Sequence, residues 1–164
     1  MNDVAFMTTY MHQLSTLPYC VDQSIFCLNR MAGGIRNNGV MFEVEAKRTI
    51  RITSIDIHTP VKDEIIPISV YTTSGSAAGK ENDSSQWQKI ASDKVLGKGD
   101  HHSTNVPVSR VIRAGRTVAF YLDTPSVFIP GPIRYSPSNI PTGAIYSEDN
   151  SISIIVGYVH LFSV

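Results

Sequence analysis

The stretch TIRITSIDIHT, residues 49–59, sets isoleucine at every second position except for one change of phase. A period of two is typical of a β-strand that buries one face in a hydrophobic core. The two isoleucines before the change and the two after it fall on different phases. A shift by one residue is what a β-bulge produces, so the stretch predicts a bulge near Thr53 and Ser54.

Four further segments alternate in the same way, and turn residues such as Gly, Pro, Asn, Asp and Ser separate them. Short strands divided by such turns are typical of a β-sandwich or jelly roll of about eight strands. We therefore expect an all-β protein, an antiparallel β-sandwich with a jelly-roll-like arrangement. The four segments are residues 40–46, 66–73, 116–124 and 151–162.

The chain has 164 residues, which fits one domain with an extended arm. We assign residues 1–36 to an N-terminal arm and residues 37–164 to the β-sandwich domain. The 14 basic and 14 acidic residues give a formal net charge of zero. A neutral surface favours association between proteins, whereas nucleic acid needs a clustered basic surface, so we expect a homo-oligomer and no nucleic-acid partner.

No stretch approaches the roughly 18 apolar residues that a membrane span requires, so no span is expected. The N-terminal stretch lacks the basic region and the long apolar region of a signal peptide. The compartment is left open by these observations.

The arm contains four of the five methionines, both cysteines and little clean alternation. Its apolar positions fit a short helix, for which no clear cap is present, or an apolar arm that docks on its own body or on a neighbour. Cys20 and Cys27 fit a disulfide in a tight loop or two free thiols, and we favour free thiols because two cysteines do not make a disulfide framework. The arm residues that we assign to assembly are Phe6, Met7, Tyr10 and Met11.

Basic residues are densest in two short groups. Strand edges often carry such charges to block unwanted pairing, so we interpret both groups as solvated edges rather than binding patches. The groups are Lys47, Arg48 and Arg51, and Arg110, Arg113 and Arg116.

Asp56 and His58 alternate with isoleucines, so both project from the second face of their strand. With His101 or His102 they have the donor types of a zinc site. Their spacing is not a recognised ligand motif, and a solvent-facing pair is the simpler interpretation.

Acidic loop residues offer oxygen ligands for calcium, although such residues more often form local turns. The chain has no nucleophile elbow, no phosphate-binding glycine loop and no dinucleotide fingerprint. We therefore predict no enzymatic activity, no cofactor and no resident metal. The acidic candidates for calcium are Glu81, Asp83, Asp100 and Asp149.

Aromatic side chains with a polar tip suit wet interfaces, and several could form a platform for a sugar. Packing in the core or on a sheet face is the alternative for each ring. Two polar loops, residues 74–86 and 98–107, would flank the platform. The aromatic residues of the platform are Trp87, Tyr71, Tyr121 and Tyr135. The residues that we assign to a possible ligand loop are Trp87, Tyr71, Glu81 and Asp83.

Three motifs give the chain a family likeness: Asn-Gly before VMFEV, Trp87 after ISVYTTSGSAAGKE, and Ala-Gly-Arg before TVAFY. With ITSIDIHT, VLGKG, IRYS and SEDNSISIIVGY they span about Gly39 to Tyr158. This region resembles a poorly characterised β-sandwich domain that recurs in predicted proteins of diatoms, other algae and some marine bacteria. The resemblance implies a non-catalytic module, often of extracellular or surface-type proteins, and it supplies no active-site residues.

Three functions follow as hypotheses. The first is a non-enzymatic interaction module that self-associates or builds a structural assembly through arm exchange or edge-strand addition. The second is a carbohydrate-binding or adhesion module, with or without calcium. The third is a metal-dependent enzyme that uses Asp56, His58 and a loop histidine.

Overall fold

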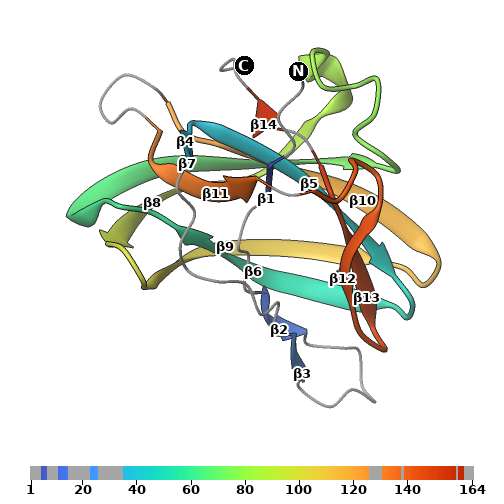
Figure 1. Ribbon diagram of the computed structural model, residues 1–164. Coiled ribbons are helices and arrows are strands. Elements are labelled where there is room, and N and C mark those ends of the chain that lie inside the picture. The colour runs from blue at the N-terminus through green and yellow to red at the C-terminus, as the bar shows by residue number, and fades with distance from the viewer. Residues whose placement is uncertain are drawn as a thin grey trace.

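The structure, a computed structural model, is an all-β sandwich whose named strands pair antiparallel throughout the described part of the chain (Figure 1). It describes residues 5–6, 11–14, 23–25, 35–125, 131–137, 139–157 and 159–160. The predicted fold class is confirmed. Within these residues, no helix has the length and hydrophobicity of a membrane span.

The larger layer is a seven-stranded sheet centred on β5 and β10. β14 pairs with the start of β5, and β13 pairs with its end. In order across the sheet, the strands are β12 (Ile145–Glu148), β13 (Ile152–Ile155), β5 (Gly39–Ala46), β10 (Arg116–Asp123), β7 (Lys62–Ser74) and β8 (Gln88–Lys98), with β14 (Val159–His160) beside β5.

The smaller layer is a four-stranded sheet in the order β3 (Gln23–Ile25), β2 (Met11–Leu14), β6 (Ile50–His58) and β9 (Ser103–Ile112). The register between β6 and β9 shifts between Ile52 and Ser54, which confirms the predicted bulge. β1 (Ala5–Phe6), β11 (Ile133–Pro137) and β4 (Ile35–Asn37) form a third, three-stranded sheet.

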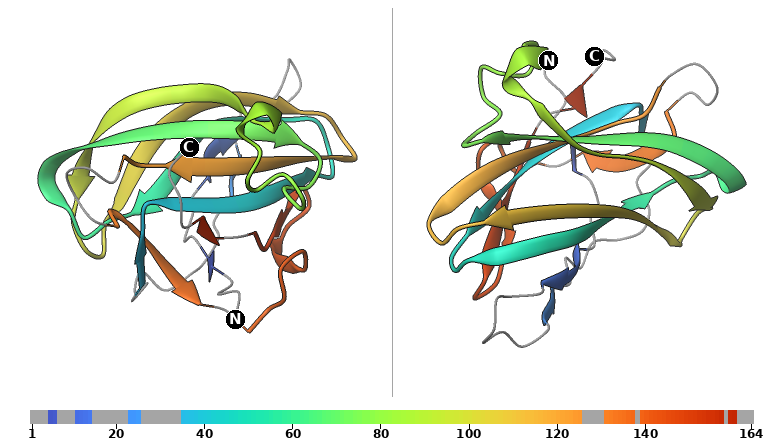
Figure 2. Two further views of the ribbon diagram at one scale, coloured as in Figure 1. Left: turned by 90° about the horizontal axis from the view of Figure 1, so that it is seen from above. Right: turned by 180° about the vertical axis from the view of Figure 1, so that it is seen from behind.

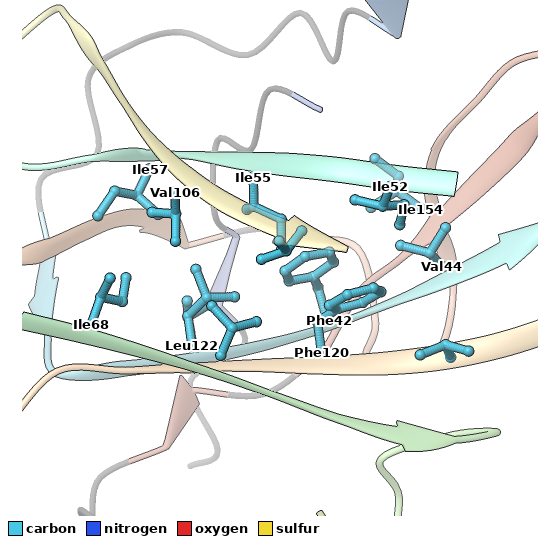
Figure 3. Packing of buried hydrophobic residues seen from close by; sticks show 14 of the residues in the cluster. Phe42, Val44, Ile52, Ile55, Ile57, Ile68, Val106, Phe120, Leu122 and Ile154 are labelled. Carbon is cyan, nitrogen blue, oxygen red and sulfur yellow. The ribbon is translucent and has the colours of Figure 1, made fainter. Parts of the chain in front are cut away.

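The core lies between the two layers and consists of the inward side chains of both (Figure 3). Phe42 of β5 and Phe120 of β10 stack with ring centroids 5.3 Å apart. Isoleucines of β6, among them Ile52 and Ile55, face this pair from the opposite sheet (Figure 3). Burying each such side chain stabilises the fold by roughly 1.5–3 kcal/mol, so period-two burial is the main source of stability.

Two boundaries differ from the prediction. The polar loop at residues 98–107 is much shorter, because β9 begins at Ser103. The segment at residues 151–162 is interrupted after β13, where Gly157 passes so close to β5 that a Cβ atom would collide with the Met41 carbonyl oxygen. The backbone contact, which no alternation pattern encodes, explains the break between β13 and β14.

The short helix considered for the arm is wrong where the structure describes it, because Ala5–Phe6 and Met11–Leu14 are strands. The spacing of their apolar residues fits both a helix and a strand. Pairing with strands of the sandwich domain favours the strand. Cys20 and Cys27 lie outside the described residues, so the prediction of free thiols stays a prediction.

Candidate functional site

The connection from β7 to β8 folds back over the outer face of the large sheet, above β5 and β10 (Figure 1, Figure 2). It ends in a short 3-10 helix, η1 (Ser84–Gln86), directly before Trp87. Ala77 of this connection is fully buried against the sheet. We call residues 75–87 the covering loop.

Three of the predicted platform aromatics meet beneath the covering loop. Tyr71 stacks on Tyr121 with ring centroids 5.7 Å apart, and Trp87 meets Tyr121 edge-on at 5.8 Å. The Trp87 indole N–H donates to the Lys80 carbonyl oxygen at 2.9 Å. Lys89 Nζ lies 5.1 Å from the centre of the Tyr71 ring.

The aromatic cluster therefore holds the loop on the sheet. Tyr121 is fully buried, while Tyr71 and Trp87 are half-buried. Because the only polar atom of Trp87 already has a partner inside the protein, the ring offers a ligand a partly exposed apolar surface and no free donor. Tyr135 is buried in β11, outside this cluster.

A buried carboxylate fixes the other end of the covering loop. Glu43 of β5 accepts hydrogen bonds from the Ser76 hydroxyl at 2.6 Å and from the Ala77 backbone N–H at 2.9 Å. A carboxylate buried with two donors is held firmly in place. The alternation in β5 suggests a solvent-facing glutamate, and only the position of the loop explains its burial.

A second carboxylate supports Tyr121. The Tyr121 hydroxyl donates to Asp123 Oδ1 at 3.0 Å, and both residues are buried. Burial and the neighbouring Asp123 carboxylate raise the pKa of Tyr121 far above its ordinary value, so the phenol keeps its proton. Gly39 completes the site, since a Cβ atom there would lie 2.7 Å from Tyr121 Cε2.

Asp83, an acidic candidate for calcium in the covering loop, takes part in local hydrogen bonds. Asp83 is the N-cap of η1 and accepts from the Ser85 backbone N–H and hydroxyl and from Gln86 Nε2. The Ser85 hydrogen bonds lower the pKa of the exposed Asp83 carboxyl. Glu81 is half-buried. Among the described residues, no group of three or more His, Cys, Asp or Glu side chains is placed to hold a metal ion.

Asp56 and His58 are buried rather than solvent-facing, with 2% and 4% of their surface exposed, so the simpler interpretation of this pair is wrong. Asn105 Nδ2 donates to Asp56 Oδ1 at 2.6 Å. Burial lowers the pKa of His58, the Asp56 carboxylate raises it, and nearby His101 lowers it. Alternation distinguishes the two faces of a strand, but it cannot show that other segments cover the second face.

The assembly residues of the arm are placed in part. Phe6 lies in β1, opposite Ser136 of β11, and Met11 lies in β2, opposite Ile25 of β3. Met7 and Tyr10 are outside the described residues.

No protein-family model matches the chain, and no curated protein matches its sequence at a significant level. The resemblance to the algal and marine bacterial domain therefore stays a hypothesis. The structure shows an all-β sandwich with a loop fastened across one face.

Proposed function

We propose that this protein is a non-enzymatic β-sandwich module that self-associates by exchanging its N-terminal arm between copies. The observation that carries the proposal is how the arm attaches to the body. β1 adds to β11, and β2 adds to β6 with Leu14 opposite Ile52. Strand addition uses backbone hydrogen bonds, which the same arm can make equally well with a second copy.

The length of the connection supports exchange. Nine residues separate the end of β3 from the start of β4. Fully extended, such a segment spans up to about 30 Å, which is enough to carry the arm to a neighbouring body. The neutral net charge adds little repulsion between copies.

Other edges of the described sheets are poor sites for association, which favours the arm over edge-strand addition. β8 carries exposed lysines such as Lys94 and Lys98. β9 contains Pro107, which has no backbone N–H to donate. β12 is four residues long, and its register shifts between Ile145 and Ser147. Lysine, proline and irregular short strands are the usual protections of an edge.

Light scattering over a range of protein and salt concentrations tests the proposal. The full chain is expected to form a defined oligomer, and a chain that lacks residues 1–30 is expected to be a folded monomer. Near-ultraviolet circular dichroism checks that the shortened chain keeps its packed aromatic core. An unchanged oligomer after the deletion, with the core intact, would remove arm exchange.

A double variant separates the two routes to assembly. In Lys94→Thr/Lys98→Thr the β8 edge loses its protective charges. Arm exchange predicts the same oligomer as the unmodified chain. If the otherwise unmodified chain still associates without residues 1–30 and the double variant enlarges that assembly, self-association belongs to the β8 edge instead.

A second candidate, carbohydrate binding, rests on Trp87 and Tyr71, which stay half-exposed on the same face. Stacking on a sugar ring would use their apolar faces, since the Trp87 N–H is already bonded. A glycan array with and without calcium tests this function, with Trp87→Phe as the variant. Absence of binding at high protein concentration would remove it.

A further inference from the structure

One end of the sandwich contains a pocket of about 510 Å³, which meets the covering loop only at its first residue, Gly75, and includes no residue of the arm. It lies where the ends of β7 and β9 meet the start of β10. β8 begins opposite Thr72, so the last residues of β7 run past it and leave this end of the sheet uncovered. We call it the arginine pocket, and the lining residues used below are Ser74, Arg110, Val111, Arg113, Arg116 and Thr117.

Arg110 occupies a position where the fold expects an apolar side chain. In β9 the buried residues alternate as Val106, Val108 and Ile112, and Arg110 falls in the same phase. It also pairs in register with the core residue Ile52. Its Nε atom is buried and has no hydrogen-bond partner among the residues that the structure describes. A buried donor without a partner costs roughly 1–3 kcal/mol, so a ligand acceptor at this atom would stabilise the site.

Arg113 and Arg116 flank the turn between β9 and β10, and both exposed residues line the pocket. Two hydrogen bonds hold the turn in place, one to the end of β5 and one to the connection between β5 and β6. The Gly115 N–H donates to the Ala46 carbonyl oxygen at 2.7 Å, and the Ala114 N–H donates to Thr49 Oγ1 at 3.2 Å. The backbone that carries both arginines is therefore positioned before any ligand binds.

The three positive charges have no counter-ion within the described residues. None of the pocket's lining residues is acidic, and neither salt bridge found there involves these arginines. The other basic group contrasts with them, because Lys47 pairs with Glu148 at 2.7 Å. Two hydroxyl-bearing residues, Ser74 and Thr117, also line the pocket.

We infer that the arginine pocket binds a phosphate or sulfate group carried by a small molecule. Guanidinium groups bind such oxyanions through paired, charge-assisted hydrogen bonds. A pocket of this volume is within the range of small-molecule sites. Arg110 supplies the buried donor, while Arg113 and Arg116 supply charge. This site is independent of arm exchange, so either proposal can fail without the other.

Titration of the full chain with sodium phosphate and with sodium sulfate, at constant ionic strength set by chloride, tests the inference. Backbone amide chemical shifts are expected to change saturably at residues 74–75 and 110–118. The double variant Arg113→Gln/Arg116→Gln is expected to weaken binding at least about tenfold, because each charged hydrogen-bond partner contributes strongly to oxyanion affinity. Arg110→Met, which keeps the apolar stem and removes the buried donor, is expected to do the same.

The matched control is Lys94→Gln/Lys98→Gln, which removes two positive charges from β8 and leaves the pocket intact. It should bind phosphate and sulfate as the unmodified chain does. An equal loss in the control, shifts spread over all basic residues, or no saturation would overturn the inference. Any of these results would mean that the ions act by general electrostatic screening and do not bind in the pocket.

Two esters, glucose 6-phosphate and galactose 6-sulfate, identify the source of the group. Affinity at least about tenfold above that of the free ion assigns the pocket to an ester ligand. Equal affinity for ester and ion would overturn the small-molecule part of the inference and leave only a site for the free ion. The binding of both esters and of both free ions is measured for the pocket variants as well as for the unmodified chain.

Discussion

β10 buries side chains on both of its faces, but the two faces are stabilised differently. On the inner face Phe120 and Leu122 pack against other apolar side chains between the sheets. On the outer face Tyr121 is buried against Trp87 of the covering loop, and its hydroxyl donates a hydrogen bond to the buried Asp123. The inner face depends on volume and apolar area, whereas the outer face depends on paired polar atoms and on the loop staying in place.

The largest expected effect is on the inner face. Phe120→Ala removes one partner of the stacked phenylalanine pair and leaves a cavity between the sheets. We expect the free energy of unfolding to fall by about 3–5 kcal/mol. Urea unfolding followed by circular dichroism, at one fixed protein concentration because of self-association, measures the change. A loss below about 1 kcal/mol would mean that the inner face is not tightly packed.

Gly39→Ala tests packing on the outer face. The new methyl group would lie 2.7 Å from Tyr121 Cε2, and Tyr121 is held between Tyr71 and Trp87 and cannot retreat easily. We expect a loss of about 1–3 kcal/mol from overpacking. The same urea experiment measures it.

A second background checks the cause of this loss. In Tyr121→Leu the ring atoms that clash are absent, so adding Gly39→Ala there should cost much less than in the unmodified chain. Equal costs in both backgrounds would assign the effect to the backbone of β5 rather than to the ring.

Tyr121→Phe tests the polar component of the outer face alone. It removes the hydroxyl that donates to Asp123 and keeps the ring stacking. We expect a loss of about 1–2 kcal/mol, since a buried carboxylate loses one donor. Phe120→Tyr is not an equivalent control because it adds a polar atom to the core, so Leu122→Met serves as a conservative inner-face change. If Tyr121→Phe has no effect, the hydrogen bond contributes nothing net.

The smallest effect concerns the second face of β6 and depends on pH. The folded-state pKa of His58 lies below its ordinary value of 6.5, mainly because the side chain is buried. The unfolded chain therefore binds more protons, and stability is lost as the pH falls from about 6.5 through the folded-state pKa. Asp56 and His101 act on the same group with opposite signs.

Urea unfolding between pH 5 and 8, a range estimated from ordinary carboxyl and imidazole pKa values, measures this dependence. His58→Gln should flatten the slope near the unfolded pKa. His102→Gln, at an exposed position, should leave it unchanged. An identical slope in His58→Gln would assign the dependence to other groups.

Alternation in the sequence predicts the inner faces because period-two burial is a local property of each strand. It predicts the fold class, and the change of phase among the isoleucines predicts the bulge between Ile52 and Ser54. It does not predict the burial of Glu43, because that depends on where a loop more than thirty residues later comes to lie. Whether the second face of a strand is buried depends on tertiary packing and not on the periodicity of the strand.

Arg110 breaks the apolar alternation of β9, and the sequence itself contains this signal. Counting back from Ile112 in steps of two gives Arg110, Val108 and Val106, which sets an arginine in an otherwise apolar series. The interpretation of the three arginines as edge charges does not account for the position of Arg110 in this series. The pocket itself was not predictable, because it depends on β8 starting late relative to the end of β7.

The position of Trp87 gives the protein a built-in optical reporter. It is the only tryptophan in the chain, and its ring contacts Tyr121 at the base of the covering loop. Tryptophan emission therefore follows the docking of that loop, while far-ultraviolet circular dichroism follows the sheets. If the two signals change together during unfolding, the loop and the sandwich form one cooperative unit. If emission shifts to longer wavelength first, the loop opens as a separate step, and its opening can be followed in real time without any added label.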